Sequence, residues 1–243
     1  MTQANPGDHS SLMDRIGGSW GSAFRDVLLI VGSILIAFSL EAWWDSRGDA
    51  GREREALAAL AEELRNASVE LDSVIAFNEG RVEAARYFLS IEPGAADAVP
   101  TDSLAFALGA LGGGMTFDPS LGATEAIIAG GLDLVTDVEI RSRIAAWPGM
   151  MREIEVDQAV MVERWEKISD ASVDAELNGL RLRSSLDPDN ERVTRSLATA
   201  ALVDPVMRQR VAAQALSITS VLDELRDVEG RLNDLREAIG AGT

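Results

Sequence analysis

The chain has 243 residues, of which 47% are hydrophobic, and a formal net charge of −18 from 40 acidic and 22 basic side chains. This acidic balance argues against nucleic acid as a partner, because contact with phosphates needs clustered Lys and Arg. The chain contains no cysteine, which excludes disulfides, thiolate nucleophiles and cysteine metal sites, and its single histidine, His9, lies in a polar N-terminal tail.

Residues 24–44 are predicted to form one transmembrane helix. The fourteen residues 27–40 include only two polar ones, both serines. The distance from Phe24 to Trp43 is about 28 Å in a helix, close to the thickness of a bilayer core, and tryptophans near both ends are typical of a membrane interface. A cleaved signal peptide and a buried core helix are the alternatives, but the segment lacks a basic start and a good cleavage site.

The chain is therefore divided into a short polar tail (1–23), a transmembrane anchor (24–44) and an extramembrane domain (45–243). Positive charges flank both ends of the anchor, so counting them does not decide the orientation. We expect the large acidic domain to lie outside the cytoplasm.

One face of the predicted anchor is a candidate for contact with a partner. Ser33, Ala37 and Glu41 are four residues apart and share this face, and small residues at that spacing let a second helix approach closely. Glu41 is either a carboxylate at the water interface or the acid of an ion pair with a neighbouring span. With Trp43 and Trp44, these residues are the predicted partner contacts.

A long helix is predicted from Gly51 to about Ile91, where Glu92-Pro93-Gly94 ends it. Its seam positions alternate in steps of three and four, the pattern of a coiled coil; they are Leu57, Leu60, Leu64, Ala67, Leu71, Val74 and Asn78.

Three shorter helices are expected next. The first begins at Thr101 and stops at Gly112-Gly113-Gly114; a helix stop is also our interpretation of GALGGG (109–114), which superficially resembles a phosphate loop. The second begins at an Asp118-Pro119 cap and ends at Gly130-Gly131. The third begins at the capping box 136–139 and ends at Trp147, before Pro148-Gly149.

A second long helix follows Pro148-Gly149, and its seam comprises Ile154, Gln158, Met161, Trp165, Ile168, Ser172 and Ala175. The last helix begins at an Asp204-Pro205 cap. Its seam is apolar at nine of ten positions, namely Met207, Val211, Gln214, Ile218, Val221, Leu225, Val228, Leu232, Leu235 and Ile239. The predicted fold is all-α, an antiparallel helical bundle with long coiled-coil-like helices behind one N-terminal transmembrane helix. Essentially no sheet is expected.

No catalytic, cofactor-binding or metal-binding residues are predicted, and the protein is not expected to be an enzyme. Hydrolytic triads usually need a histidine base, and zinc sites need His and Cys, none of which follows His9. The acidic pairs Glu62-Glu63 and Asp223-Glu224 are interpreted as solvated helix faces.

The segment FDPSLGATEAIIAGGLDLVTDVEIRSRIAAW (117–147) has a glycine turn, Gly130-Gly131, followed by Leu132-Asp133-Leu134-Val135 and then Glu139-Ile140-Arg141. With Ala42-Trp43-Trp44-Asp45 after the apolar run, it resembles a family of uncharacterised bacterial single-span membrane proteins with a helical extramembrane domain. The chain departs from the family pattern, with Ala-Trp-Trp in place of an Asn-rich sequence. The resemblance implies an anchored helical domain in the bacterial inner membrane, periplasmic by our expected orientation, and carries no functional site.

These patterns favour a membrane-anchored structural or accessory protein that contacts other membrane proteins through its span and its helical bundle. The expected partners are the lipid bilayer and either a membrane protein or further copies of this chain, with no nucleic acid and no cofactor. The alternative is an extracytoplasmic ligand-binding or sensory bundle that signals through a partner, because bundles place small-molecule sites between their helices.

Overall fold

The computed structural model describes the backbone of residues 13–169 and 190–242 and, within these, the side chains of all but 13–27, 42, 44–46, 169 and 241–242. The described part is all-α and contains no strand, which confirms the predicted fold class. The chain divides into two compact units, Met1–Arg54 and Glu55–Thr243. Ser172 and Ala175, predicted seam residues, lie outside the described residues.

The first unit contains the beginning of α1 (Met13–Ser90). Large apolar side chains between residues 28 and 40 are 47–70% exposed. In the part of the chain whose side chains are described, which begins at residue 28, no helix has the length and apolar character needed to cross a membrane.

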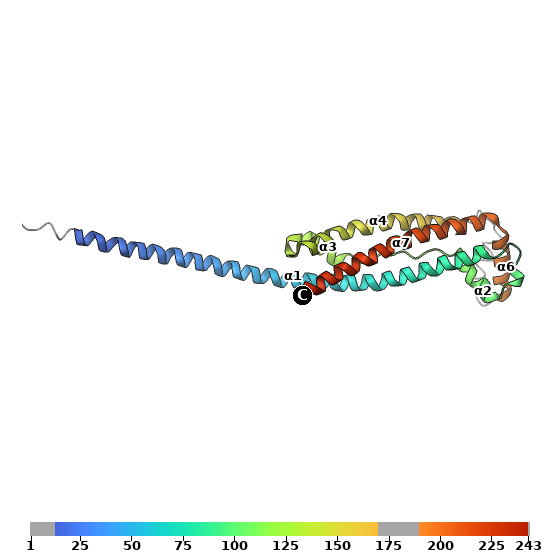
Figure 1. Ribbon diagram of the computed structural model, residues 1–243, viewed down its shortest axis with the longest axis horizontal. Helices are drawn as coiled ribbons and strands as arrows, with labels where there is room; N and C mark the ends of the chain where they lie inside the picture. The colour runs from blue at the N-terminus through green and yellow to red at the C-terminus, as the bar shows by residue number, and fades with distance from the viewer. Residues whose placement is uncertain (1–12, 170–189, 243) are drawn as a thin grey trace, which may run out of the picture. The chain divides into compact units, whose positions relative to one another are not determined.

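The second unit is built on three long helices, α1 beyond residue 54, α4 (Val138–Ser169) and α7 (Pro205–Gly242) (Figure 1). Polar contacts give their directions. Arg236 reaches Ser68 and Arg226 reaches Glu79, so α7 is antiparallel to α1. Arg143 lies 3.8 Å from Asp234, and Arg210 bonds the Lys167 carbonyl, so α7 is also antiparallel to α4.

The predicted seams form the core. All seven seam residues of α1 and all ten of α7 are buried. On α4, Ile154, Gln158, Met161 and Ile168 are buried, whereas Trp165 is 36% exposed and lies at the margin. The alternation of three and four residues thus identified the inner faces of α1 and α7 correctly and, among the described residues of α4, all seam positions except Trp165.

Short helices gather at one end of this unit (Figure 1), and their side chains contribute to a second buried cluster. It joins the end of α1 to η1 (Ala96–Ala98), α2 (Thr101–Leu108), η2 (Gly109–Leu111), α6 (Glu191–Val203) and the start of α7. Phe88, Leu104 and Leu202 are fully buried here.

Two predicted helix starts are confirmed. Helix α2 begins at Thr101, and the Asp204 carboxylate caps α7 by accepting from the Val206 N–H at 2.8 Å.

Two predicted boundaries around α4 are wrong. The cap is Asp137 rather than Thr136, since its carboxylate accepts from the N–H groups of Glu139 and Ile140 at 2.8 and 3.0 Å. The helix also continues through Pro148, although proline removes one backbone hydrogen bond. Buried side chains on both sides, Trp147 and Ile154, anchor the two halves to one core, so tertiary packing outweighs the local signal.

Between α2 and α4 lie α3 (Gly122–Gly130) and η3 (Leu132–Leu134). Gly131 has φ +100°, which supplies the positive-φ turn predicted at Gly130-Gly131. Thr124 and Ile127 of α3 are buried against the long helices, whereas Ile128 is 39% exposed.

Gln214 is the one predicted polar position in the α7 seam, and it is 1% exposed. Neither its amide nitrogen nor its amide oxygen has a hydrogen-bond partner among the described residues. A buried amide without partners costs about 1–3 kcal/mol.

We therefore expect Gln214→Leu to raise the free energy of unfolding by about 1–2 kcal/mol. The matched variant Gln158→Leu should lower it by about 2–4 kcal/mol, because the amide of Gln158 bonds both backbone groups of Phe117. Thermal and urea unfolding followed by circular dichroism measure both. A lower free energy of unfolding for Gln214→Leu would contradict the inference that the buried amide costs stability.

Candidate functional site

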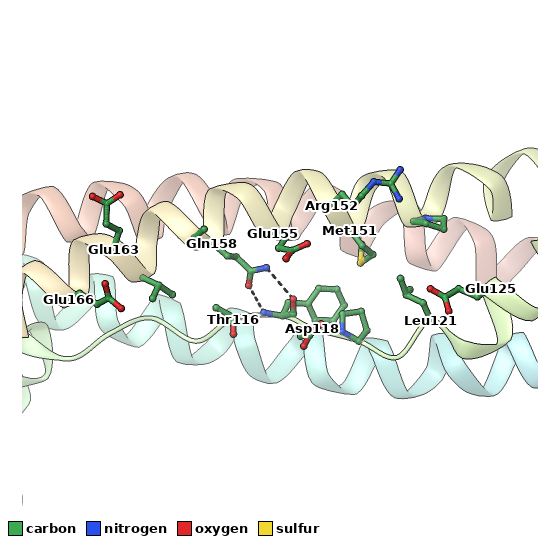
Figure 2. Close-up of a pocket in the computed structure, with 15 residues that line it drawn as sticks. Thr116, Asp118, Leu121, Glu125, Met151, Arg152, Glu155, Gln158, Glu163 and Glu166 are labelled. Atoms are coloured by element: carbon green, nitrogen blue, oxygen red, sulfur yellow. Dashed lines mark hydrogen bonds between the residues drawn. The ribbon is translucent and has the colours of Figure 1, made fainter.

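An extended segment, residues 112–121, runs between α1 and α4 (Figure 2). Two buried seam amides hold it. Asn78 of α1 donates to the Met115 carbonyl and accepts from the Met115 N–H, both at 2.8 Å. Gln158 of α4 accepts from the Phe117 N–H and donates to the Phe117 carbonyl at 3.1 Å. The amides act as the neighbouring strands would in a sheet, satisfying alternate residues.

The glycines that open the segment allow it to pass close to both helices. A Cβ at Gly113 would lie 2.9 Å from the Trp165 ring, and one at Gly114 would overlap Met161 and Asn78. The prediction that these glycines end a helix is confirmed, since η2 ends at Leu111. Their lack of side chains has a second role that the sequence pattern did not indicate.

Two carboxylates of α1 fix the end of the segment. Glu70 accepts from the Asp118 N–H at 3.0 Å. Glu63 accepts from the N–H groups of Ala123 and Thr124, and from the Thr124 hydroxyl at 2.6 Å. An anion at the first turn of α3 satisfies N–H groups that the helix itself leaves free and interacts favourably with the helix dipole.

These contacts correct two predictions. Asp118-Pro119 does not begin a helix, because Gln158 and Glu70 hold Phe117 and Asp118 extended, and α3 begins four residues later at Gly122. Glu63 is not part of a solvated face but a half-buried cap supplied by another helix. Glu62 is exposed, as predicted.

A groove of about 720 Å³ lies between the extended segment, the start of α3 and the adjacent face of α4 (Figure 2). We call it the acidic groove. Its apolar lining is formed by Phe117, Pro119, Leu121, Pro148, Met151, Ala159 and Val162, and its polar lining by Thr116, Asp118, Glu125, Arg152, Glu155, Gln158, Glu163 and Glu166.

The charge of the acidic groove is strongly unbalanced. Five carboxylates line it against one guanidinium, and Figure 2 shows that Arg152 extends away from the extended segment. Lys167 binds Glu163 at 2.7 Å and lowers the pKa of that carboxyl. The side chains of Glu125, Glu155 and Glu166 make no hydrogen bond or ion pair within the described part of the chain.

A second acidic cluster lies between α4 and α7. Burial, together with a hydrogen bond to Asp157 and the nearby charges of Asp157, Glu153 and Asp227, raises the pKa of Glu224 from 4.5 to about 7. The interpretation of Asp223-Glu224 as a solvated pair is therefore wrong for Glu224, which is half-buried, and correct for Asp223, which is exposed and lies 3.2 Å from Arg226.

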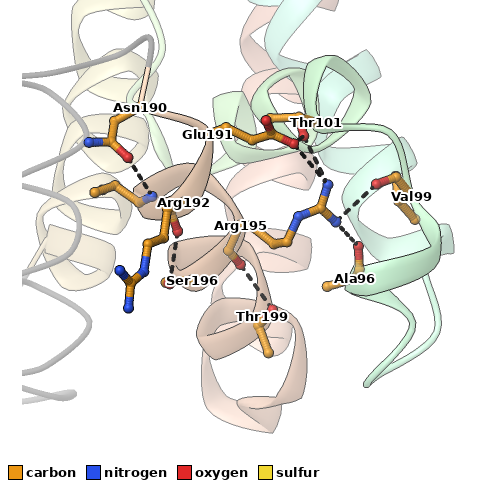
Figure 3. Close-up of polar contacts among 10 residues, drawn as sticks. Ala96, Val99, Thr101, Asn190, Glu191, Arg192, Arg195, Ser196 and Thr199 are labelled. Carbon is orange, nitrogen blue, oxygen red and sulfur yellow. Dashed lines mark hydrogen bonds and ion pairs between the residues drawn. The ribbon is translucent and has the colours of Figure 1, made fainter.

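The polar cluster around Arg195 is structural (Figure 3). Its guanidinium donates to the Ala96 carbonyl and the Thr101 hydroxyl, both at 2.9 Å, and to the Val99 carbonyl at 3.3 Å. Glu191 accepts from Thr101 at 2.7 Å and lies 3.6 Å from Arg195. The contacts tie α6 to the turn before α2.

The predicted partner-contact residues are separate from the groove. Ser33, Ala37 and Glu41 are exposed on one face of α1. Trp43 is 46% exposed, with the Arg47 guanidinium 4.6 Å from its ring centre. The side chain of Trp44 lies outside the described residues. Arg141 and Arg143 pair with the carboxylates of Asp133 and Glu139.

Within the described residues, no three Asp, Glu or His side chains are arranged to hold a metal ion. Comparison with known proteins found no matching family model, no similar curated protein and no similar solved structure. The resemblance to a single-span membrane family therefore stays a prediction.

We expect Glu63→Gln to lower the free energy of unfolding by about 1–2 kcal/mol, because a charged cap at the first turn of α3 is replaced by a neutral one. Glu62→Gln, the adjacent exposed position, should change it by less than about 0.5 kcal/mol. Urea unfolding of both variants measures the difference, and equal effects would contradict the capping role.

Glu224 should make stability fall as the pH rises from 4.5 to about 7. In this window the folded state binds more protons at Glu224 than the unfolded state, so raising the pH favours unfolding. Glu224→Gln should weaken this pH dependence and raise the free energy of unfolding at alkaline pH. The expected gain is only about 0.5–1 kcal/mol, because water screens a half-exposed carboxyl. Asp223→Asn is the control. If the free energy of unfolding varies with pH in the same way for Glu224→Gln and the wild type, Glu224 is not the source of the pH dependence.

Proposed function

We propose that this protein is a single-span membrane-anchored accessory protein whose helical bundle presents the acidic groove to a partner. The observation that carries the proposal is the apolar part of α1. Nine large apolar side chains between residues 28 and 40 are 47–70% exposed. Apolar side chains on all sides of a helix favour lipid or other helices as its surroundings.

The polar side chains of this part suit the same environment. Ser33 and Ser39 donate their hydroxyl protons to the carbonyls of Ile30 and Leu35 at 2.8 and 2.7 Å. Hydroxyls that bond within their own helix need no water, so both serines are compatible with a bilayer core.

The exposed face of Ser33, Ala37 and Glu41 supports contact with a second span. Two small residues one turn apart let helices approach closely, and a carboxylate at the edge of the span can pair with a cation of the partner. We place the anchor in the bacterial inner membrane and the bundle on its periplasmic side. The protein is not proposed to be an enzyme.

A second candidate is a ligand-binding bundle. The acidic groove favours it, because a volume of about 720 Å³ is in the usual range of small-molecule sites. Unlike a ligand-binding bundle, the proposed accessory protein requires a protein partner that stays bound after extraction.

We expect the full-length protein to stay with membranes through an alkaline carbonate wash and to keep its N-terminus, as read by intact mass. After mild extraction by a C-terminal tag, native mass spectrometry should show a stoichiometric foreign subunit. Ala37→Leu should reduce that subunit, whereas Leu35→Ala, on another face, should not. A soluble mature chain that starts after Trp44 would refute the anchor, and extraction of the chain alone would refute the accessory role.

A further inference from the structure

We propose that the acidic groove binds a cationic amphipathic helix of the partner polypeptide. The apolar face of that helix would lie on the groove floor, and its Lys and Arg side chains would pair with the acidic rims. The inference rests on the proposed function and specifies its partner.

The floor is apolar and accessible. Phe117 is buried beneath it, while Leu121, Met151 and Val162 stay half-buried and line the groove, with Ala159 exposed between them. Side chains at 151, 155, 159, 162 and 166 are three or four residues apart, so they form one stripe along α4. An amphipathic helix lays apolar side chains at matching spacing into such a groove.

The rims determine the sign of the ligand. Glu155 and Glu166 are the acidic members of the α4 stripe, and Asp118 and Glu125 lie on the opposite wall, formed by the extended segment and α3. None of these four side chains is engaged by a cation in the described part of the chain, whereas Arg141, Arg143 and Arg226 of the same bundle all face carboxylates. Charge complementarity across an interface steers association and rejects partners of the wrong sign.

The length of the groove favours a helix over a small polycation. The α4 stripe from Met151 to Glu166 extends over about 22 Å, which matches about four helical turns. A polyamine would pair with the carboxylates but leave the apolar floor uncovered. A second copy of this chain is disfavoured, because each copy carries a net charge of −18.

The test uses the full-length protein in a non-ionic detergent. Because the chain has no cysteine, Ala159→Cys carries a single environment-sensitive dye on the groove floor. The probe is a Leu/Arg peptide of about four helical turns with leucines on one face. We expect saturable binding in the micromolar range that shifts the emission of the dye to the blue. The same dye at Ala59→Cys, exposed on α1, should not respond.

Matched variants separate the groove from net charge. Glu155→Gln/Glu163→Gln/Glu166→Gln should weaken binding at least about tenfold, whereas Glu83→Gln/Glu92→Gln/Glu237→Gln, three exposed positions outside the groove, should weaken it less than about twofold. Circular dichroism verifies that both triple variants stay folded.

Four outcomes would overturn the inference. They are no response at Ala159→Cys, equal weakening by both triple variants, equal binding of a Leu/Glu peptide with the same leucine pattern, and spermine binding as tight as that of the Leu/Arg peptide. Each would leave the membrane and subunit measurements of the proposed function unaffected. Conversely, a chain that washes off membranes while still binding the peptide would refute the proposed anchor but support the groove as a binding site.

Discussion

The structure depends on how the backbone of one non-helical segment is satisfied inside a helical bundle. Helices bond their own N–H and C=O groups, but an extended segment packed between them cannot. Asn78 and Gln158 solve this problem by supplying donor and acceptor together to Met115 and Phe117. Apolar side chains suffice at the other seam positions, but at positions 78 and 158 they would leave the N–H and C=O groups of Met115 and Phe117 unpaired.

The acidic groove follows from that constraint. Because the segment is held extended, its residues form one wall and α4 forms the other, with Phe117 buried at the base. Glu70 and Glu63 continue the attachment along α1, so the start of α3 closes the groove at one end. Glu63 and Glu70 of α1 are used by the fold, whereas Glu155 and Glu166 of α4 line the groove without a partner among the described residues. This division underlies the proposal of a cationic partner.

Helix α7 contains polar groups of another kind. Burial and a hydrogen bond to Asp157 raise the pKa of Glu224, and Gln214 occupies the core without a hydrogen-bond partner among the described residues. Both features cost stability at neutral pH, in contrast to the hydrogen-bonded amides of Asn78 and Gln158.

The sequence by itself determined the helical class, the inner faces of the long helices and several helix ends. These features are local: heptad spacing marks a buried stripe, and Asp204-Pro205 or a glycine at positive φ acts within a few residues. Asn78, Gln158 and Gln214 are visible in the sequence as polar residues at seam positions. No other sequence pattern marks these sites as unusual. Only the tertiary structure decided which amides found partners, that α4 continues through Pro148, that Glu63 caps α3 instead of Asp118, and that the groove is acidic. Each depends on groups distant in sequence that only the folded chain brings together, such as Glu63 and Thr124.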